Sequence, residues 1–226
     1  MWTSHIASNM NFPAPLAVMG FLAAAAGLFA ALAGALIAWF ARKPKFARLL
    51  LLTAGAGTAA YFGLLMGFSF GSHSTTLARG QEKYFCEIDC HLAYSIIDVK
   101  TDPQPAVTRY LVTLRTRFDE TTTSPTRPKD APLTPSPRLV RLLDANGREF
   151  VPAAVQGTPL LTPLKPADSY TTQLEFEIPK EKSTDKNKGE EPGSLRLLLN
   201  TTPALPDHLV IGDENSLLHK KTFFAL

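Results

Sequence analysis

The sequence predicts a two-helix transmembrane hairpin followed by an all-β antiparallel sandwich. Two apolar runs, at 16–40 and 49–70, each have at least 20 residues and contain no Asp, Glu, Lys or Arg. A bilayer core about 30 Å thick needs about 20 apolar residues at 1.5 Å rise each, so both runs are long enough to cross it. From residue 83 onward the chain consists of short segments rich in β-branched and aromatic residues, which is typical of strands.

The pattern of basic residues predicts which ends of the hairpin face the cytoplasm. The loop between the two runs carries four basic residues, and the first 12 residues carry no Lys or Arg. Positive charge is retained in the cytoplasm, so we expect the loop inside and both termini outside, in the inner (cytoplasmic) membrane of a bacterium with the large domain periplasmic. The basic residues of the loop are Arg42, Lys43, Lys45 and Arg48.

These observations divide the chain into a membrane part and an outer part. The expected segments are a short outer N-terminal segment at 1–12, transmembrane helices at 13–40 and 49–71, a cytoplasmic basic loop at 41–48, a linker at 72–82 and an extracytoplasmic domain at 83–226. A cleaved signal peptide is the alternative for the first run. That run lacks a positive n-region and is longer than the roughly 7–15 apolar residues of a signal peptide, which favours a retained helix.

Net charge gives no support for nucleic-acid binding. All 20 acidic residues lie at or after Glu82, and four of the 23 basic residues lie in the hairpin loop. The remaining 19 basic residues nearly balance the 20 acidic ones, so the basic pI reflects membrane topology. Neither apolar run contains an ionisable residue, which argues against a transporter or proton relay. The partners expected from composition are the lipid bilayer and other membrane protein subunits.

Small residues recur at every fourth position of the second apolar run. Such a stripe lets another helix approach closely. One interpretation is that the two helices of the chain pack on each other through it, and the other is that it docks onto a larger membrane complex. The first run has two comparable rows, at 23–35 and 30–38. The helix-packing residues of the stripe are Gly55, Ala59, Gly63, Gly67 and Gly71.

The outer domain is expected to be an immunoglobulin-like antiparallel sandwich. The clearest period-two alternation covers 169–178, and the Asn146-Gly147 pair between two apolar runs predicts a tight hairpin. Short strands without helical periodicity are typical of such sandwiches. Charged or Pro-rich loops are expected at 121–137 and 180–193. The expected strands are 83–87, 91–100, 106–118, 138–143, 148–151, 169–178, 194–199, 208–211 and 222–226.

Four short runs of this domain resemble a known family. Phe-Asp-Glu at 118–120, Val-Arg-Leu-Leu-Asp-Ala-Asn-Gly-Arg-Glu-Phe at 140–150, Leu-Lys-Pro-Ala-Asp-Ser-Tyr at 164–170 and Leu-Glu-Phe-Glu-Ile-Pro at 174–179 are similar to motifs of the DUF4352 family of extracytoplasmic domains. Ala167 stands where that family has Gly in a turn. The resemblance covers about residues 83–200 and implies an immunoglobulin-like fold, a binding or scaffold role and no catalytic residues.

Cys86 and Cys90 are the two cysteines of the chain, and His91 adjoins the second. In an oxidising compartment the expected state is a disulfide. On a straight strand residues four apart are separated by about 13 Å, beyond the roughly 4.4–6.8 Å between Cα atoms that a disulfide tolerates. A bond between them therefore requires a turn over 87–89. Free or structural thiols remain a further possibility.

A metal site is the functional alternative for the same residues. Two thiolates and an imidazole suit copper or zinc, so Cys86, Cys90 and His91 could bind such an ion. The binuclear copper domain of oxidase subunit II is partially similar, because it also follows a two-helix hairpin and carries a Cys-x-x-x-Cys loop. In that family the loop comes late in the domain and is followed by a second His and a Met, which this sequence lacks there. A distant His would have to be His208 or His219.

The C-terminal run 211–222 is dense in polar residues. A Ser/His/Asp set could be imagined from Ser216, His219 and Asp213. Nothing nearby resembles a nucleophile elbow or supplies an oxyanion hole, so a hydrolase site is not indicated. Such residues more often stabilise a turn, and a contact surface for a partner protein is the functional interpretation. The expected partner-contact residues are Asp213, Glu214, Asn215 and His219.

Together these features predict a protein that is not an enzyme and has no cofactor. The expected function is a membrane-anchored accessory or scaffold subunit of a membrane protein complex that presents an immunoglobulin-like domain on the periplasmic side. The alternative is a copper or redox protein, for electron transfer or metal delivery, that uses the two cysteines and His91.

Overall fold

A computed structural model describes residues 7–86, 90–123, 127–128, 130–180 and 195–226 of the chain. The chain forms two compact units. A β unit contains the residues up to 9 together with 74–202 and 221–226, and a helical unit contains 10–73 and 203–220. The C-terminal segment 203–220 therefore groups with the helices, whereas the sequence suggested that it belongs to the outer domain.

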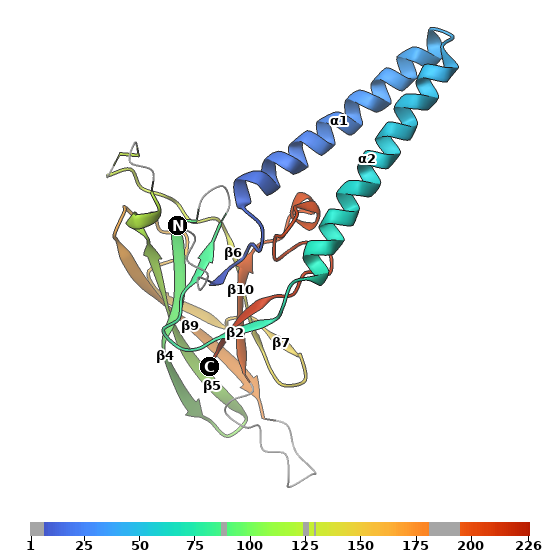
Figure 1. Cartoon of the computed structure of the whole chain (residues 1–226). Coiled ribbons are helices and arrows are strands. Elements are labelled where there is room, and N and C mark those ends of the chain that lie inside the picture. Colours follow the sequence, from blue (N-terminus) through green and yellow to red (C-terminus); the bar gives the residue numbers. More distant parts are fainter. Residues whose placement is uncertain (1–6, 87–89, 124–126, 129, 181–194) are drawn as a thin grey trace. The chain divides into compact units, whose positions relative to one another are not determined.

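The helical unit contains two long antiparallel helices, α1 (Ala14–Phe40) and α2 (Pro44–Phe70), which are labelled in Figure 1. Both are long and apolar enough to cross a membrane. Helix α2 begins five residues before the expected start, so Lys45 and Arg48 lie in its first turns. Pro44 explains this difference, because proline at the first helical position has a φ already suited to the helix and lacks only an N–H that would be unpaired there.

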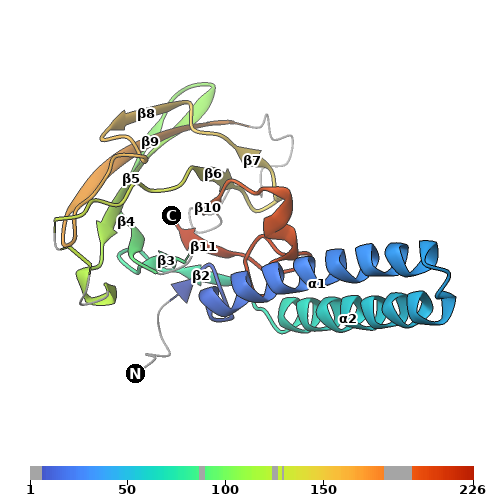
Figure 2. The same cartoon turned by 90° about the horizontal axis from the view of Figure 1, so that it is seen from above.

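The β unit is a sandwich of two sheets, which Figure 2 shows as separate layers. The first sheet has the order β1-β3-β4-β5-β9-β8, and the second has the order β2-β11-β10-β6-β7. The strands are β1 (Ala7–Ser8), β2 (Thr75–Leu77), β3 (Lys83–Phe85), β4 (Leu92–Pro103), β5 (Val107–Phe118), β6 (Arg138–Leu143), β7 (Glu149–Phe150), β8 (Ala154–Gly157), β9 (Ser169–Pro179), β10 (Arg196–Thr201) and β11 (Thr222–Ala225).

The sheets are mixed, which corrects the expectation of a purely antiparallel sandwich. Strand β1 runs parallel to β3, and β2 runs parallel to β11. Parallel neighbours need a long connection. For β1 and β3 that connection includes both helices, and for β2 and β11 it is most of the β unit.

The core of the β unit lies between the two sheets and confirms the alternation in the sequence. Strand β9 buries Thr172, Leu174, Phe176 and Ile178 on one face and keeps Glu177 exposed. The buried side chains of the first sheet meet those of β6, β10 and β11 in one apolar cluster, which includes Leu142, Leu197, Leu199 and Phe224. The predicted hairpin is also present, because β6 and β7 pair antiparallel around Asn146-Gly147.

One predicted strand is wrong, and two expected features are described only in part. Residues 208–211 do not form a strand, because the 3-10 helix η2 (Leu205–Leu209) and turns occupy this stretch. In the expected loop at 121–137, the described residues include the 3-10 helix η1 (Glu120–Thr122) and a β-bridge from Leu133 to Leu164. Most of the expected loop at 180–193 lies outside the described residues.

Candidate functional site

Helices α1 and α2 pack closely at the hairpin tip. Ala35, Ala38 and Ala47 are buried there in one small cluster with Leu50 against it. A Cβ added to Gly34 would lie 3.2 Å from Cδ1 of Leu50, so this glycine permits the close approach. Gly34, Ala35 and Ala38 belong to the small-residue rows of α1 that the sequence indicated, whereas Ala47 and Leu50 lie in α2.

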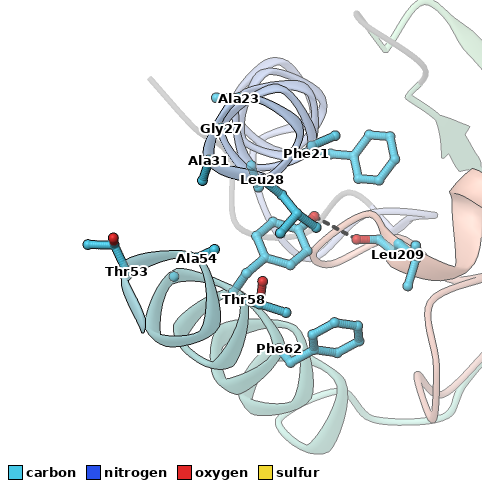
Figure 3. Close-up of a pocket in the computed structure, with 14 residues that line it drawn as sticks. Phe21, Ala23, Gly27, Leu28, Ala31, Thr53, Ala54, Thr58, Phe62 and Leu209 are labelled. Carbon is cyan, nitrogen blue, oxygen red and sulfur yellow. Dashed lines mark hydrogen bonds between the residues drawn. The ribbon is translucent and has the colours of Figure 1, made fainter. Parts of the chain in front are cut away.

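Away from the tip the two helices leave an apolar groove between them, the interhelix groove, with a cavity volume of about 420 Å³. Figure 3 shows this groove with the first row of α1 on one side and α2 on the other. Small side chains make it deep, and aromatic side chains border it. It is lined by Phe21, Ala23, Ala24, Ala25, Gly27, Leu28, Ala31, Thr53, Ala54, Gly57, Thr58, Tyr61, Phe62 and Leu209.

Tyr61 connects the interhelix groove to the C-terminal segment 203–220. Its hydroxyl donates a hydrogen bond of 2.6 Å to the backbone carbonyl of Leu209, drawn as a dashed line in Figure 3. Neither residue was identified from the sequence as functional. Tyr61 has the pattern of an ordinary membrane aromatic, and no local signal in the sequence pairs it with a residue 148 positions later.

The stripe of small residues on α2 faces away from the interhelix groove. Gly55, Ala59, Gly63, Gly67 and Gly71 are exposed, and we call this surface the small-residue face. Among the described residues nothing lies within 4 Å of a Cβ added at Gly55, Gly63 or Gly67. The two helices of the hairpin therefore do not pack on each other through this stripe, contrary to its first interpretation.

The outer part of the small-residue face is hollowed. Gly63, Gly67 and Gly71 line a shallow depression together with Leu64, Phe68 and Asn11. The Asn11 amide donates a hydrogen bond of 3.1 Å to the carbonyl of Phe68, and Phe12 packs edge-on against the Phe68 ring. The residues just before α1 therefore form one border of this depression.

Cys86 and Cys90 form a disulfide, with a Cα–Cα distance of 4.1 Å. The turn expected at 87–89 lies outside the described residues. Cys86 is buried, and its backbone N–H donates a hydrogen bond of 2.7 Å to the side-chain oxygen of Asn9. The hydroxyl of Ser8 lies 3.1 Å from Sγ of Cys86. The N-terminal strand β1 is therefore attached to the disulfide segment.

The disulfide weakens the metal interpretation of Cys86, Cys90 and His91. A bonded pair has no thiolates, and thiolates are the ligands that copper or zinc would need here. His91 is buried, stacks on Phe118 and has Nδ1 2.6 Å from Oγ1 of Thr122. Within the described residues, no group of three or more His, Cys, Asp or Glu side chains is placed to bind a metal.

A network of charged residues lies beside the disulfide strand. Arg117 donates two hydrogen bonds to Glu82, of 2.8 and 2.7 Å, and also bonds Asp119 and Tyr84. Tyr84 donates a 2.5 Å hydrogen bond to Asp119. Burial by itself would raise the pKa of Asp119, but the bonds from Tyr84, Thr121 and Arg117 outweigh it and hold that pKa well below its ordinary value.

The same network raises the pKa of Tyr84 far above its ordinary value, through burial and the bond to Asp119. Arg117 lowers the pKa of Glu82. All three groups are therefore fixed in their usual charge states near neutral pH. A general acid or base needs a pKa close to the working pH, so this network suits joining β3 to β5 and does not suit proton transfer.

The four expected partner-contact residues are placed differently from one another. Glu214 and Asn215 are buried, with 2% and 6% exposure, whereas Asp213 and His219 are half-buried. Asp213 accepts a hydrogen bond from the backbone N–H of Asn215. Burial lowers the pKa of His219. The buried pair is not available to a partner in this structure, so the polar side chains of this run serve mainly to hold its turns.

The imagined Ser, His and Asp set is not assembled. The Ser216 hydroxyl donates to the carbonyl of Val210, and Nδ1 of His219 contacts the carbonyl of Lys220. Neither contact joins the serine to the histidine, so the arrangement lacks the nucleophile and base pairing that hydrolysis of this type needs.

Comparisons with known protein families, curated proteins and solved structures found no match.

Proposed function

We propose that the chain is a non-enzymatic, membrane-anchored accessory or scaffold subunit of a membrane protein complex. Its helices α1 and α2 form an N-out/C-out hairpin, and the β unit lies on the periplasmic side. The small-residue face of α2 accepts a transmembrane helix of a partner subunit. The observation that carries this proposal is that the face is exposed along α2 and is not covered by α1.

Three features support the orientation. Ala7 and Ser8 pair with Lys83 and Tyr84, so the residues before α1 and those after α2 belong to one sheet. A sheet lies on one side of a membrane, and two helices bring the chain back to the side where it started. The four basic residues of the loop favour the cytoplasm for the hairpin tip. The disulfide between Cys86 and Cys90 fits an oxidising compartment for the β unit.

The chemistry of the small-residue face supports a helix as its partner. In lipid, helices associate through close van der Waals packing, which glycine and alanine allow. A glycine in a helix interior lowers the stability of the helix by about 1 kcal/mol relative to alanine. Repeated glycines that contact nothing in their own chain therefore favour packing against another helix. At Gly55, Gly63 and Gly67 the described chain supplies no such contact.

The test is purification of the chain in mild detergent, comparing the wild type with a Gly63→Leu, Gly67→Leu double variant. Because nothing described lies within 4 Å of an added Cβ at either position, the double variant should fold normally. We expect the wild type to co-purify with other membrane subunits and the double variant to lose them. Ala26→Leu, at an exposed position of α1 outside the interhelix groove, is the matched control and should retain them. A wild-type chain that purifies alone as a monomer would contradict the proposal.

A further inference from the structure

The C-terminal segment 203–220 has its polarity reversed relative to a soluble loop. Of its seven exposed residues, all except Lys220 are apolar. Leu205 is 79% exposed, and Leu217 and Leu218 are 43% and 62% exposed. The other exposed residues are Pro203, Ala204 and Pro206. In water such an arrangement loses the gain from burying apolar surface.

The polar side chains of the same segment point inward. Glu214, Asn215 and Ser216 are each buried, with at most 6% exposure. The Ser216 hydroxyl donates to the carbonyl of Val210, and Nδ1 of His208 lies 2.7 Å from the carbonyl of Asn215. The Asp207 carboxylate accepts from the N–H of Ala204. The segment thus uses its polar groups within its own fold and presents leucines outward.

The backbone of the segment is also hydrogen-bonded locally. Successive turns are closed by bonds from the N–H groups of Asp207, Val210, Asp213, Ser216 and His219 to carbonyls three residues earlier, and the N–H of Leu217 bonds the carbonyl of His208. Irregular backbone is tolerated close to hydrocarbon only where its polar groups are satisfied inside the protein. In this segment six backbone N–H groups bond carbonyls of the segment itself, so it meets that requirement.

Contacts within the helical unit fix the segment beside the membrane helices. Tyr61 bonds the carbonyl of Leu209 and lies nine residues before Phe70, the last residue of α2. At 1.5 Å per residue this is about 14 Å along the helix from its outer end. The N–H of Lys220 bonds the hydroxyl of Ser72, just beyond that end. The segment therefore extends along α2 from its outer end toward the middle of the helix.

Leu218 adds an independent sign that an exposed apolar side chain is required here. Its φ is 63°, a left-handed conformation that an L-residue adopts at a cost of about 1–2 kcal/mol. Glycine or asparagine would occupy this position without that cost. A strained, exposed leucine is explained if its side chain reaches an apolar environment outside the chain.

We propose that the segment 203–220 is inserted in the outer interfacial layer of the bilayer, with Leu205, Leu217 and Leu218 among the lipid acyl chains. The proposal rests on the proposed transmembrane role of α1 and α2, and it continues their lipid-exposed surface onto a non-helical element. Lys220, the exposed cation of the segment, lies beside the outer end of α2, where its ammonium can reach lipid phosphates.

The test uses nitroxide labels on the full chain in vesicles of phosphatidylethanolamine and phosphatidylglycerol. Single variants Leu205→Cys, Leu217→Cys and Leu218→Cys are labelled, while the native cysteines are bonded to each other and do not react. Collisions with oxygen, which concentrates in hydrocarbon, are compared with collisions with a water-soluble nickel chelate. We expect the ratio of oxygen to nickel collisions at these three sites to be several-fold higher than at an aqueous site.

Two leucines with known exposure provide the controls. Leu52→Cys, at a 71% exposed position of α2, reports the hydrocarbon, and Leu161→Cys, at a 47% exposed position of the β unit, reports water. If the three segment sites match Leu161 while Leu52 remains in hydrocarbon, the helices span the membrane but the segment does not enter it, and the inference is overturned. If Leu52 also behaves as an aqueous site, the proposed membrane anchoring fails and this inference fails with it.

Discussion

Ala167 occupies the third position of a tight turn in which Pro166 is the second residue. Its φ is +71°, and the N–H of Asp168 bonds the carbonyl of Lys165 at 3.0 Å. Proline followed by a residue with positive φ is the pattern of a type II turn, which glycine favours at the third position. The backbone of this turn therefore has a conformation that suits glycine better than the alanine present.

We predict that Ala167→Gly stabilises the β unit by about 1 kcal/mol, because glycine adopts the left-handed conformation without the steric cost that alanine has. Urea unfolding of the full chain in detergent, followed by circular dichroism of the β unit, measures the change. Ala153→Gly is the matched control, because Ala153 is exposed and is not among the residues with positive φ. That variant should be slightly less stable than the wild type, since glycine only adds entropy to the unfolded chain.

Asp119 gives a second residue-scale prediction, which depends on pH. Its folded pKa lies below the unfolded value, so its stabilising effect is present above the unfolded pKa and disappears as the pH falls through the folded pKa. Asp119→Asn should therefore cost about 2 kcal/mol at pH 7, the size expected for hydrogen bonds to a charged group. The difference from the wild type should shrink steadily below about pH 4, the ordinary pKa of an aspartate.

Urea unfolding at pH 7 and at pH 3 measures this effect. Asp130→Asn, at an exposed position, should change little at either pH. A cost for Asp119→Asn that stays constant down to pH 3 would show that the carboxylate does not stabilise the fold through its charge.

At the scale of elements, regular patterns in the sequence predicted most strands and both helices. The alternation over 169–178 matches β9, and the run 106–118 matches β5 to within one residue. Strands β1 and β2 were missed because they lie outside the range 83–226 expected for the outer domain, and β8 has only four residues. Their pairing comes from tertiary contacts, such as Asn9 with Cys86, that no local pattern contains.

The disulfide closes a loop of only five residues, so its contribution to stability is limited. The chain-entropy relation gives about 2 kcal/mol for a loop of this length. We predict that the Cys86→Ala, Cys90→Ala variant remains folded and loses about that amount, because the core between the two sheets does not depend on the bond. Urea unfolding with and without a reducing agent tests this, and the reductant should affect the wild type alone. Loss of all β structure in the variant would contradict it.

Gly212 connects the C-terminal segment to the residues before α1. The N–H of Asn11 bonds its carbonyl, its φ is +76°, and a Cβ placed there would lie 2.5 Å from Cβ of Phe12. We predict that Gly212→Ala releases the segment 203–220 from the helical unit, because the new methyl group cannot be accommodated. Thermolysin cleavage within the segment, in detergent, should become faster than in the wild type.

The matched control for this substitution is Gly80→Ala. Gly80 also has a positive φ, +83°, but nothing described lies within 4 Å of an added Cβ. It should therefore show the backbone strain without the steric clash. Equal rates of cleavage within the segment for the two variants would mean that the contact with Phe12 does not hold it.

At the scale of the whole molecule, the sequence located the candidate surfaces but not how they are used. The small-residue face of α2 is visible in the sequence as a four-residue repeat. Its exposure depends on how the two helices cross, which the repeat does not show. The interhelix groove also depends on that crossing. The polar run 211–222 predicted an accessible surface, but hydrogen bonds such as that from Ser216 to Val210 turn its polar groups inward. Tertiary geometry, not residue type, determines accessibility here.

The orientation of the whole molecule gives the last prediction. The N-terminal strand and β3 belong to one sheet, so in the proposed membrane orientation both ends of the hairpin lie on the same side. The remaining determinant is the basic loop, because a cytoplasmic excess of Lys and Arg sets orientation. We predict that replacing all four loop residues with Gln produces a mixture of the two orientations. The variant carries Arg42→Gln, Lys43→Gln, Lys45→Gln and Arg48→Gln.

The redox state of Cys86 and Cys90 reports that orientation. In the inverted fraction the β unit faces the reducing cytoplasm, so both thiols should react with a maleimide that adds mass, whereas the bonded pair in the wild type should not. Protease added to spheroplasts should digest the β unit of the wild type and leave that of the inverted fraction intact. Lys100→Gln with Lys180→Gln, two exposed positions of the β unit, removes basic charge away from the loop and should leave the orientation unchanged. If the loop variant stays fully bonded and fully digested, the orientation is set by the folding of the β unit and not by the loop charges.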